Sequence, residues 1–387
     1  MLKPFIYTAM VLASCEFAIG AGCTFDGNNT AQGFDQVDGE TDGGGNETLP
    51  LLDSGIPAGG CPVGSDFICA TGQPDSSWEV QQDILINTDS DSRCRTLVQP
   101  NNTKVCLFYV DGFTLADGVR LRAIGSRPLL IASDHDIVIH GIVDVSSARG
   151  EVPGASANSS VCNQGDSADS HFAGGGGGAG GSFQGPGGNG GTGNRNGLFD
   201  KGDGGLAGGV IASPTTLRGG CIGHEGKNSD GGSGGSSGGS VGFLAGNIFT
   251  LSQNARIMAN GSGGQGASNS AGGGGAGTGG LVSISAQELI LLGEISANGG
   301  GGGGGGSLFE DGGDGRNGSD AQAADGGVNS GSGGNGGKGS SSQALIFGEE
   351  GNSATAGAGG GGGGAGYIML TGQVSSSVTT SPAPTYL

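Results

Sequence analysis

The triplet Asp134-His135-Asp136 has the residue types in this chain that are best suited to chemistry. Two carboxylates beside an imidazole can hold a cation or transfer a proton. Adjacent side chains of an extended chain point to opposite faces, so we expect His135 to face away from both carboxylates and the triplet to be a polar turn. The remaining histidines are isolated in the sequence and predict no site: His140, His171 and His224.

Acidic residues also gather in one glycine-rich segment near the C-terminal end. Carboxylates and free backbone carbonyls of such a loop can ligate Ca²⁺. The tandem G-G-x-G-x-D pattern of calcium-binding β-rolls is absent, and Asp89-Ser90-Asp91-Ser92 lacks the Gly and the distal Glu of an EF-hand loop. We therefore expect solvated acids and no cofactor or metal, and keep Ca²⁺ as a weak alternative for four residues: Asp311, Asp314, Asp320 and Asp325.

Other patterns of catalysis or nucleotide binding do not stand out. The chain has no G-x-x-x-x-G-K-[ST] phosphate loop and no convincing G-x-S-x-G nucleophile turn. With 15 Lys and Arg against 35 Asp and Glu, its net charge of −20 repels nucleic-acid phosphates. We therefore expect a protein that is not an enzyme and has no nucleic-acid partner.

The first residues are typical of a bacterial export signal. Lys3 precedes an apolar stretch at 5–12 that is too short to span a bilayer. Leu12-Ala13-Ser14-Cys15 resembles the lipobox of bacterial lipoproteins, which predicts lipidation of Cys15. Cys23 is the alternative lipidation site, and a plain cleaved signal with an incidental cysteine is the third interpretation.

The N-terminal composition then predicts how the chain is held at the cell. Residues 1–22 form the expected export segment, and residues 23–60, rich in Gly, Asp, Asn, Thr and Glu, form an expected acidic flexible stalk. A lipid anchor would attach the chain to a membrane. We expect a location at the outer membrane, at the cell surface or outside the cell of a Gram-negative bacterium.

Six of the eight cysteines follow the two at the N-terminal end. In an exported chain, such cysteines favour disulfides over metal-bound thiolates. Six cysteines allow 15 connectivities, so the sequence leaves the pairing open. Proximity along the chain favours Cys61–Cys69 and Cys94–Cys106, and the remaining pair, Cys162–Cys221, then spans a long glycine-rich loop.

Short apolar runs separated by Asp, Gly and Ser predict strands from residue 61 onward. One of them, Val119-Arg120-Leu121-Arg122-Ala123, alternates apolar with charged residues, as a half-buried strand does. No segment after the export signal shows a convincing apolar period of 3.6 residues. We therefore expect an all-β protein with a small disulfide-containing β region at 61–126. Further runs lie at 83–87, 105–110, 128–132 and 137–139.

A set of three apolar runs then recurs along residues 127–375. Each copy offers three short strands within about twenty residues, and a single copy cannot bury its own apolar face. Stacked copies would form a β-helix or a similar β-solenoid. The full copies lie at 130–145, 241–261 and 281–299, the last two ending in Ala259-Asn260-Gly261 and Ala297-Asn298-Gly299, and a partial copy lies at 366–374.

Glycine accounts for 94 of the 387 residues and is concentrated between these copies. The long glycine-rich excursions lie at about 148–240, 262–280 and 300–365. Loops of this length are either functional or disordered. A third interpretation is extended polyglycine stacked side by side, because no β-carbon keeps the chains apart. The Ser, Thr and Pro of residues 376–387 predict a disordered tail.

Four phrases of the chain carry a resemblance to known proteins: Arg93-Cys94-Arg95-Thr96-Leu97, Leu121-Arg122-Ala123-Ile124-Gly125-Ser126-Arg127-Pro128-Leu129, Asp144-Val145-Ser146-Ser147 and Leu217-Arg218-Gly219-Gly220-Cys221. They resemble an uncharacterised family of glycine-rich secreted proteins and lipoproteins common in myxobacteria. The resemblance covers roughly residues 83–375, implies no established activity and gives no catalytic residue. The glycine runs are similar to the PE-PGRS proteins of mycobacteria in composition alone, since the N-terminal PE domain is absent.

The function expected from these features is that of a non-enzymatic protein of the cell envelope or surface. Its role would be structural, adhesive or polysaccharide-binding, with a surface polysaccharide or an envelope protein as partner. The alternative is a carbohydrate-active β-helix enzyme, a polysaccharide lyase or hydrolase. Such an enzyme needs charged side chains that converge on one strand face, and the copies offer only Arg256, Glu288 and Glu294.

Overall fold

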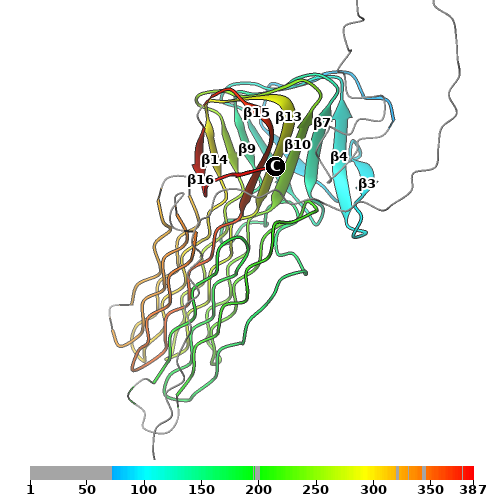
Figure 1. Ribbon diagram of the computed structural model, residues 1–387. Coiled ribbons are helices and arrows are strands. Elements are labelled where there is room, and N and C mark those ends of the chain that lie inside the picture. Colours follow the sequence, from blue (N-terminus) through cyan, green and yellow to red (C-terminus); the bar gives the residue numbers. More distant parts are fainter. Residues whose placement is uncertain are drawn as a thin grey trace, which may run out of the picture. The chain divides into compact units, whose positions relative to one another are not determined.

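The computed structural model describes residues 72–387, except 195, 197–200, 320, 321, 330, 342–345 and 377. It contains strands and no helix within these residues, which confirms the all-β class (Figure 1). The larger sheet contains β1 (Trp78–Val80), β3 (Arg95–Val98), β4 (Lys104–Val110), β5 (Phe113–Leu115), β7 (Leu129–Ser133), β8 (Ile137–Ile139), β10 (Ser240–Ala245), β11 (Ile248–Leu251), β13 (Leu281–Leu291), β15 (Tyr367–Val374) and β17 (Thr385–Tyr386). The smaller sheet contains β2 (Ile84–Asn87), β6 (Arg120–Ile124), β9 (Ile142–Asp144), β12 (Arg256–Met258), β14 (Glu294–Ser296) and β16 (Thr379–Ser381).

The strand pairs are parallel, with the exception of the antiparallel pair β3–β4. In the smaller sheet the order is β16-β14-β12-β9-β6-β2, so each strand pairs with its counterpart from the preceding and the following part of the chain. In the larger sheet, the first half of β13 pairs with β10 and its second half pairs with β11. Two of the three short strands expected in the copy at 281–299 are thus one long strand.

Apolar residues of successive strands lie in register across these sheets. Leu129, Val241, Val282 and Ile368 form one such row through β7, β10, β13 and β15, and all four side chains are fully buried. Comparable rows run through the smaller sheet, where Val143 of β9 lies beside Ile257 of β12. One hydrophobic core collects these rows from both sheets. Parallel pairing thus lets each short strand bury side chains that it could not bury alone.

A second apolar cluster covers the opposite face of β4, β7, β10, β13 and β15. The glycine-rich segment between β9 and β10 contributes Phe183 and Leu217 to it, and these pack with Leu130 and Tyr367 of the sheet. The rings of Phe183 and Tyr367 meet edge to face, with centroids 5.0 Å apart. This part of the sheet is therefore buried on both faces, which explains why β7 and β10 are continuous apolar runs and do not alternate.

The glycine-rich segments run side by side beyond the strands (Figure 1). The central run 299–306 donates backbone hydrogen bonds of 2.8–3.0 Å to three segments, at 271–277, 313–316 and 334–337. Its α-carbons approach the carbonyl groups of three further segments, at 262–268, 325–328 and 357–363.

Residues three apart in this run face the same neighbour. Gly300, Gly303 and Gly306 donate to Gly277, Gly274 and Ala271 in turn. A period of three is that of an extended backbone with three residues per turn. Such a chain turns its hydrogen-bonding groups to all sides, so it can be surrounded by other chains in the way a flat strand cannot. The described parts of the excursions are therefore packed and hydrogen-bonded, unlike disordered loops or stretches that bulge outward.

Two expected boundaries differ in the structure. Strands on both sides of residue 126 share both sheets, because β4 pairs with β7 and β6 pairs with β9. The expected disordered tail at 376–387 contains β16 and β17, which pair with β14 and β15. Backbone hydrogen bonding to an open sheet edge does not require apolar side chains, so composition alone gives no sign of it. Residues 1–60, with the expected export segment and stalk, lie outside the described residues.

Candidate functional site

The triplet Asp134-His135-Asp136 forms the turn between β7 and β8. Its three side chains go to separate partners. Asp134 accepts a hydrogen bond from the hydroxyl of Tyr109, and Asp136 accepts from the amide nitrogen of Asn247 at 2.9 Å. The ring of His135 lies 3.1 Å from the carboxylate of Asp111. The arrangement is that of a polar turn whose three side chains do not converge.

The acidic residues weighed for Ca²⁺ are spread over different contacts. Asp314 accepts a hydrogen bond from Gly266 N at 2.9 Å and lies 3.5 Å from Arg149 Nε. Asp325 lies 3.9 Å from Lys338 Nζ and 4.0 Å from Arg316 Nε. Asp311 is exposed, and Asp320 lies outside the described residues. No group of three or more His, Cys, Asp or Glu suited to a metal occurs in the part of the chain that the structure describes.

The other charged and imidazole side chains considered from sequence are also dispersed. Arg256 and Glu294 pair with each other on adjacent strands at 3.2 Å, and Glu288 lies partly buried on β13. His140 contacts the hydroxyl of Ser252 at 2.7 Å. Burial lowers the pKa of His224, which keeps that imidazole neutral.

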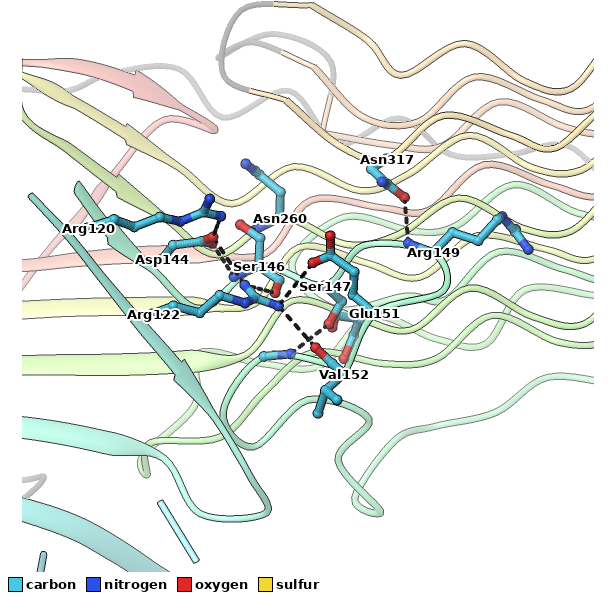
Figure 2. Close-up of polar contacts among 12 residues, drawn as sticks. Arg120, Arg122, Asp144, Ser146, Ser147, Arg149, Glu151, Val152, Asn260 and Asn317 are labelled. Carbon is cyan, nitrogen blue, oxygen red and sulfur yellow. Dashed lines mark hydrogen bonds and ion pairs between the residues drawn. The ribbon is translucent and has the colours of Figure 1, made fainter. Parts of the chain in front are cut away.

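A buried ion-pair cluster lies where β9 leads into the first glycine-rich excursion (Figure 2). Asp144 is 1% exposed and faces the guanidinium groups of Arg120 and Arg122, the latter at 3.1 Å. Arg122 also donates to the carbonyl groups of Ser146 and Val152, each at 3.0 Å. Both arginines lie on β6, two positions apart, so their side chains point to the same face of the sheet. The cluster therefore fixes the chain as it leaves the smaller sheet, and its acid is occupied by its partners.

An amide–hydroxyl ladder continues from this cluster across the following strands. Ser146 Oγ accepts from the backbone of Asn260, and the Asn260 side chain donates to Ser296 Oγ and accepts from the backbone of Asn298, at 2.8–3.0 Å. The ladder ends at Ser381, whose hydroxyl donates to Asn298 at 2.9 Å. Both asparagines are buried. The recurring Ala-Asn-Gly phrase thus places alanine in the core, asparagine in the ladder and glycine at the start of the packed backbone.

A groove of about 560 Å³ lies beside the Cys162–Cys221 disulfide. Four parts of the chain form its walls: the β3–β4 turn, Ser126 in the β6–β7 turn, the segment 156–161 and the segment 211–218. Most of its lining residues carry a hydroxyl or amide group and none is an aspartate or glutamate, while apolar residues such as Val161, Ile211 and Pro214 also line it and apolar atoms make up the larger part of its surface. Lining side chains include Asn101, Thr103, Ser126, Asn158, Ser159, Ser213, Thr215 and Thr216.

Hydrogen bonds between side chain and backbone hold these walls in place. Gln99 and Leu217 form a reciprocal buried pair, with distances of 2.9 Å and 2.7 Å. Asn101 donates to Thr216 Oγ1 at 3.2 Å, and Asn158 exchanges hydrogen bonds with Ser237 at 2.7 Å and 2.9 Å. The groove is therefore held in a defined shape, because hydrogen bonds fix its walls to one another and to the glycine-rich segments.

Arg218 is the one charged residue in the lining of this groove. It is 8% exposed, and its guanidinium stacks on the ring of Phe183 at 5.1 Å. It donates to the carbonyl of Gly219 at 3.3 Å and to the sulfur of Cys162 at 3.3 Å. None of the ion pairs between described residues includes Arg218, and burial lowers its pKa.

The cysteine pairings Cys94–Cys106 and Cys162–Cys221 are both present as disulfides. Proximity along the chain predicts the first pairing, and the second is the pair expected to remain. Cys61 and Cys69, like the lipidation candidates Cys15 and Cys23, lie outside the described residues. Disulfides form and persist in oxidising compartments, so the two bonds favour a location outside the cytoplasm. No helix long and apolar enough for a bilayer is found in the described residues.

Sequence reasoning did not find the groove. One feature of the sequence points to it: in Leu217-Arg218-Gly219-Gly220-Cys221, an arginine lies three positions before a cysteine that forms a disulfide. Comparison of the chain with protein-family models, with curated proteins and with solved structures finds no match.

Proposed function

We propose that this chain is an exported, non-enzymatic protein of the Gram-negative cell envelope or surface, anchored by a lipid and able to bind polysaccharide. The observation that carries the proposal is the fixed groove, in which many residues offer hydroxyl and amide groups to the hydroxyl groups of a sugar chain. A glycoside hydrolase would need two carboxyl groups on either side of the bond to be cut. The lining contains no carboxylate, which favours binding over hydrolysis.

The scaffold in this proposal is a three-sided β-solenoid that carries a polyglycine bundle. Three series of parallel pairs support the solenoid: β4-β7-β10-β13-β15, β1-β5-β8-β11-β13 and β2-β6-β9-β12-β14-β16. Each turn of the chain would add one strand to each series. The period of three in the glycine segments supports a polyglycine II type of packing. Such a scaffold would hold the groove rigidly.

The anchor in this proposal is an acyl group on Cys15, with Cys23 as the alternative, followed by the acidic stalk at 23–60. The two disulfides support this route, because disulfides persist in the oxidising compartments outside the cytoplasm to which exported proteins are delivered. Mass spectrometry of the mature N-terminus tests this part. An acylated cysteine at position 15 or 23 is expected, and an unmodified residue beyond Cys23 would contradict the anchor.

Binding of the full chain to immobilised polysaccharides and to isolated envelope fractions tests the central part. Retention is expected, with release of no cleaved glycan. The groove variant Ser213→Trp fills the site with a bulky side chain and should abolish retention. The matched variant Ser229→Trp also changes an exposed serine, outside the groove, and should bind normally. Turnover of a glycan that one carboxylate substitution abolishes would instead support an enzyme.

A further inference from the structure

Arg218 is a buried cation that has no carboxylate partner among the described residues. Its contacts are one backbone carbonyl, two sulfur atoms and an aromatic face, with the sulfur atoms at 3.3 Å and 3.8 Å. Burying a charge without a hydrogen-bonded counter-charge is costly, and buried arginines are ordinarily paired with carboxylates. The groove that Arg218 lines is therefore a place where an anionic group would gain a strong partner.

The cationic character continues into the hollow beside the groove. This hollow shares Thr103 and Ser126 with the groove and is also lined by Lys104 and Arg127. Its single acid, Asp89, accepts from the backbone and the hydroxyl of Ser126 at 2.6–2.7 Å and lies 3.7 Å from Arg127 Nε, so Lys104 is the basic residue of this hollow that does not pair with it. Three of the 15 basic residues thus lie along one continuous surface with one acid, in a chain that has 35 acids.

The overall negative charge does not prevent binding of an anion here. At physiological ionic strength, the interactions of exposed charges fade over about 8 Å. A ligand in the groove therefore responds mainly to the groups that line it. The net charge of −20 would still slow the approach of a polyanion, mostly at low salt.

We infer that the groove binds an acidic polysaccharide, with a uronate carboxylate paired to Arg218 and a further carboxylate of the same chain near Lys104. The guanidinium offers parallel N–H donors that match the two oxygens of a carboxylate. The surrounding hydroxyl and amide groups would bond to the neutral hydroxyls of the sugar rings. This inference rests on the proposed polysaccharide-binding function and specifies its ligand.

Isothermal titration calorimetry of the full chain with polygalacturonate, dextran sulfate and neutral dextran tests the inference. Polygalacturonate is expected to bind most tightly. Arg218→Gln should weaken it at least about 10-fold and Lys104→Gln about 3- to 10-fold, as expected for the loss of charge-assisted bonds. Lys201→Gln removes an exposed lysine outside both hollows and should leave binding within about 2-fold.

Arg218 is buried, and Arg218→Gln could prevent folding. Lys104 is exposed, so Lys104→Gln should fold normally and keeps the inference testable in that case. Arg218→Lys keeps the charge without the paired donors and should bind between wild type and Arg218→Gln. Equal binding of neutral dextran, or unchanged polygalacturonate binding in Lys104→Gln and Arg218→Gln, would overturn the acidic-ligand inference and leave the proposed function standing. Binding of dextran sulfate without polygalacturonate would overturn the carboxylate assignment. Binding to none of the three and to no envelope glycan would overturn both proposals.

Discussion

Gly303 lies directly against the backbone of Gln265, and a β-carbon on Gly303 would overlap the carbonyl oxygen of that residue. The backbone N–H of Gly303 also donates to the carbonyl of Gly274, and its carbonyl accepts from the N–H of Gly360, each at 2.8 Å. Three other segments of the chain therefore contact Gly303. The glycine is required by the space between chains and does not adopt an unusual backbone angle.

Gly303→Ala is therefore expected to lower the free energy of unfolding by at least about 3 kcal/mol, because a fixed backbone atom must move. Chemical denaturation followed by circular dichroism measures the change. Gly209→Ala is the matched control, since its β-carbon would meet the mobile end of the Asn163 side chain. Equal stability of the two variants would contradict the packed arrangement of the glycine segments.

Asp144→Asn should destabilise the protein by about 2 kcal/mol, because it leaves Arg120 and Arg122 without their shared buried partner. This loss of stability is smaller than that expected for a fully buried ion pair, because the Arg120 side chain is about half exposed and water screens its charge. Glu151→Gln changes an exposed acid 3.7 Å from Arg122 and should cost no more than about 0.5 kcal/mol. Thermal and urea unfolding of both variants distinguish the two contributions.

Tyr109 gives the protein a dependence on alkaline pH. Burial, together with the hydrogen bond to Asp134, raises the pKa of Tyr109 to about 12. The unfolded phenol titrates near pH 10, so the unfolded state loses this proton first. Stability from this group is complete below about pH 10 and falls by about 2 kcal/mol as the pH rises towards 12.

The measurement for this prediction is urea unfolding at pH values from 8 to about 12. Tyr109→Phe removes the titrating group, so the difference in stability between wild type and variant should shrink over this range. Tyr367 also has a raised pKa and contributes equally to both proteins, which is why the difference is the informative quantity. A difference that stays constant with pH would contradict the assignment.

The Cys162–Cys221 disulfide closes a loop with a sequence separation of 59 residues, against 12 for Cys94–Cys106. Restriction of the unfolded chain grows with loop length and gives about 4 kcal/mol for the long loop and about 3 kcal/mol for the short one. The double variant Cys162→Ser/Cys221→Ser should therefore lose more stability than Cys94→Ser/Cys106→Ser. Denaturation under non-reducing conditions compares them, and the reverse order would show that native-state contacts outweigh loop length.

Much of the strand content follows from the sequence, because apolar runs such as 137–139 and 248–251 coincide with β8 and β11. The short strands β1, β3 and β5 were not predicted. With three or four residues each, they show too little pattern, and their pairing partners lie elsewhere in the chain. Stacked polyglycine is one of three interpretations that the sequence allows for the glycine-rich segments. Which segments are neighbours could not be predicted, since polyglycine carries no side-chain pattern and its partners, such as Gln265 for Gly303, are fixed by the fold.

The groove was beyond sequence reasoning for a related reason. Its walls come from residues more than a hundred positions apart, as the Gln99–Leu217 pair shows. Arg218 has no carboxylate near it in sequence or in the lining of the groove, so no spacing pattern marks it. The triplet Asp134-His135-Asp136, which the sequence predicts to be a polar turn and not a site, contacts Tyr109, Asp111 and Asn247.

The bundle around residues 299–306 also sets how the stability of this protein responds to temperature. Unfolding it would expose mostly peptide groups to water, and hydration of polar surface lowers the heat capacity whereas hydration of apolar surface raises it. The heat-capacity increment of unfolding should therefore lie below the usual value of about 12–15 cal/mol/K per residue. A smaller heat-capacity increment flattens the curve of stability against temperature. The protein should therefore resist cold denaturation better than a chain of equal length with an ordinary hydrophobic core.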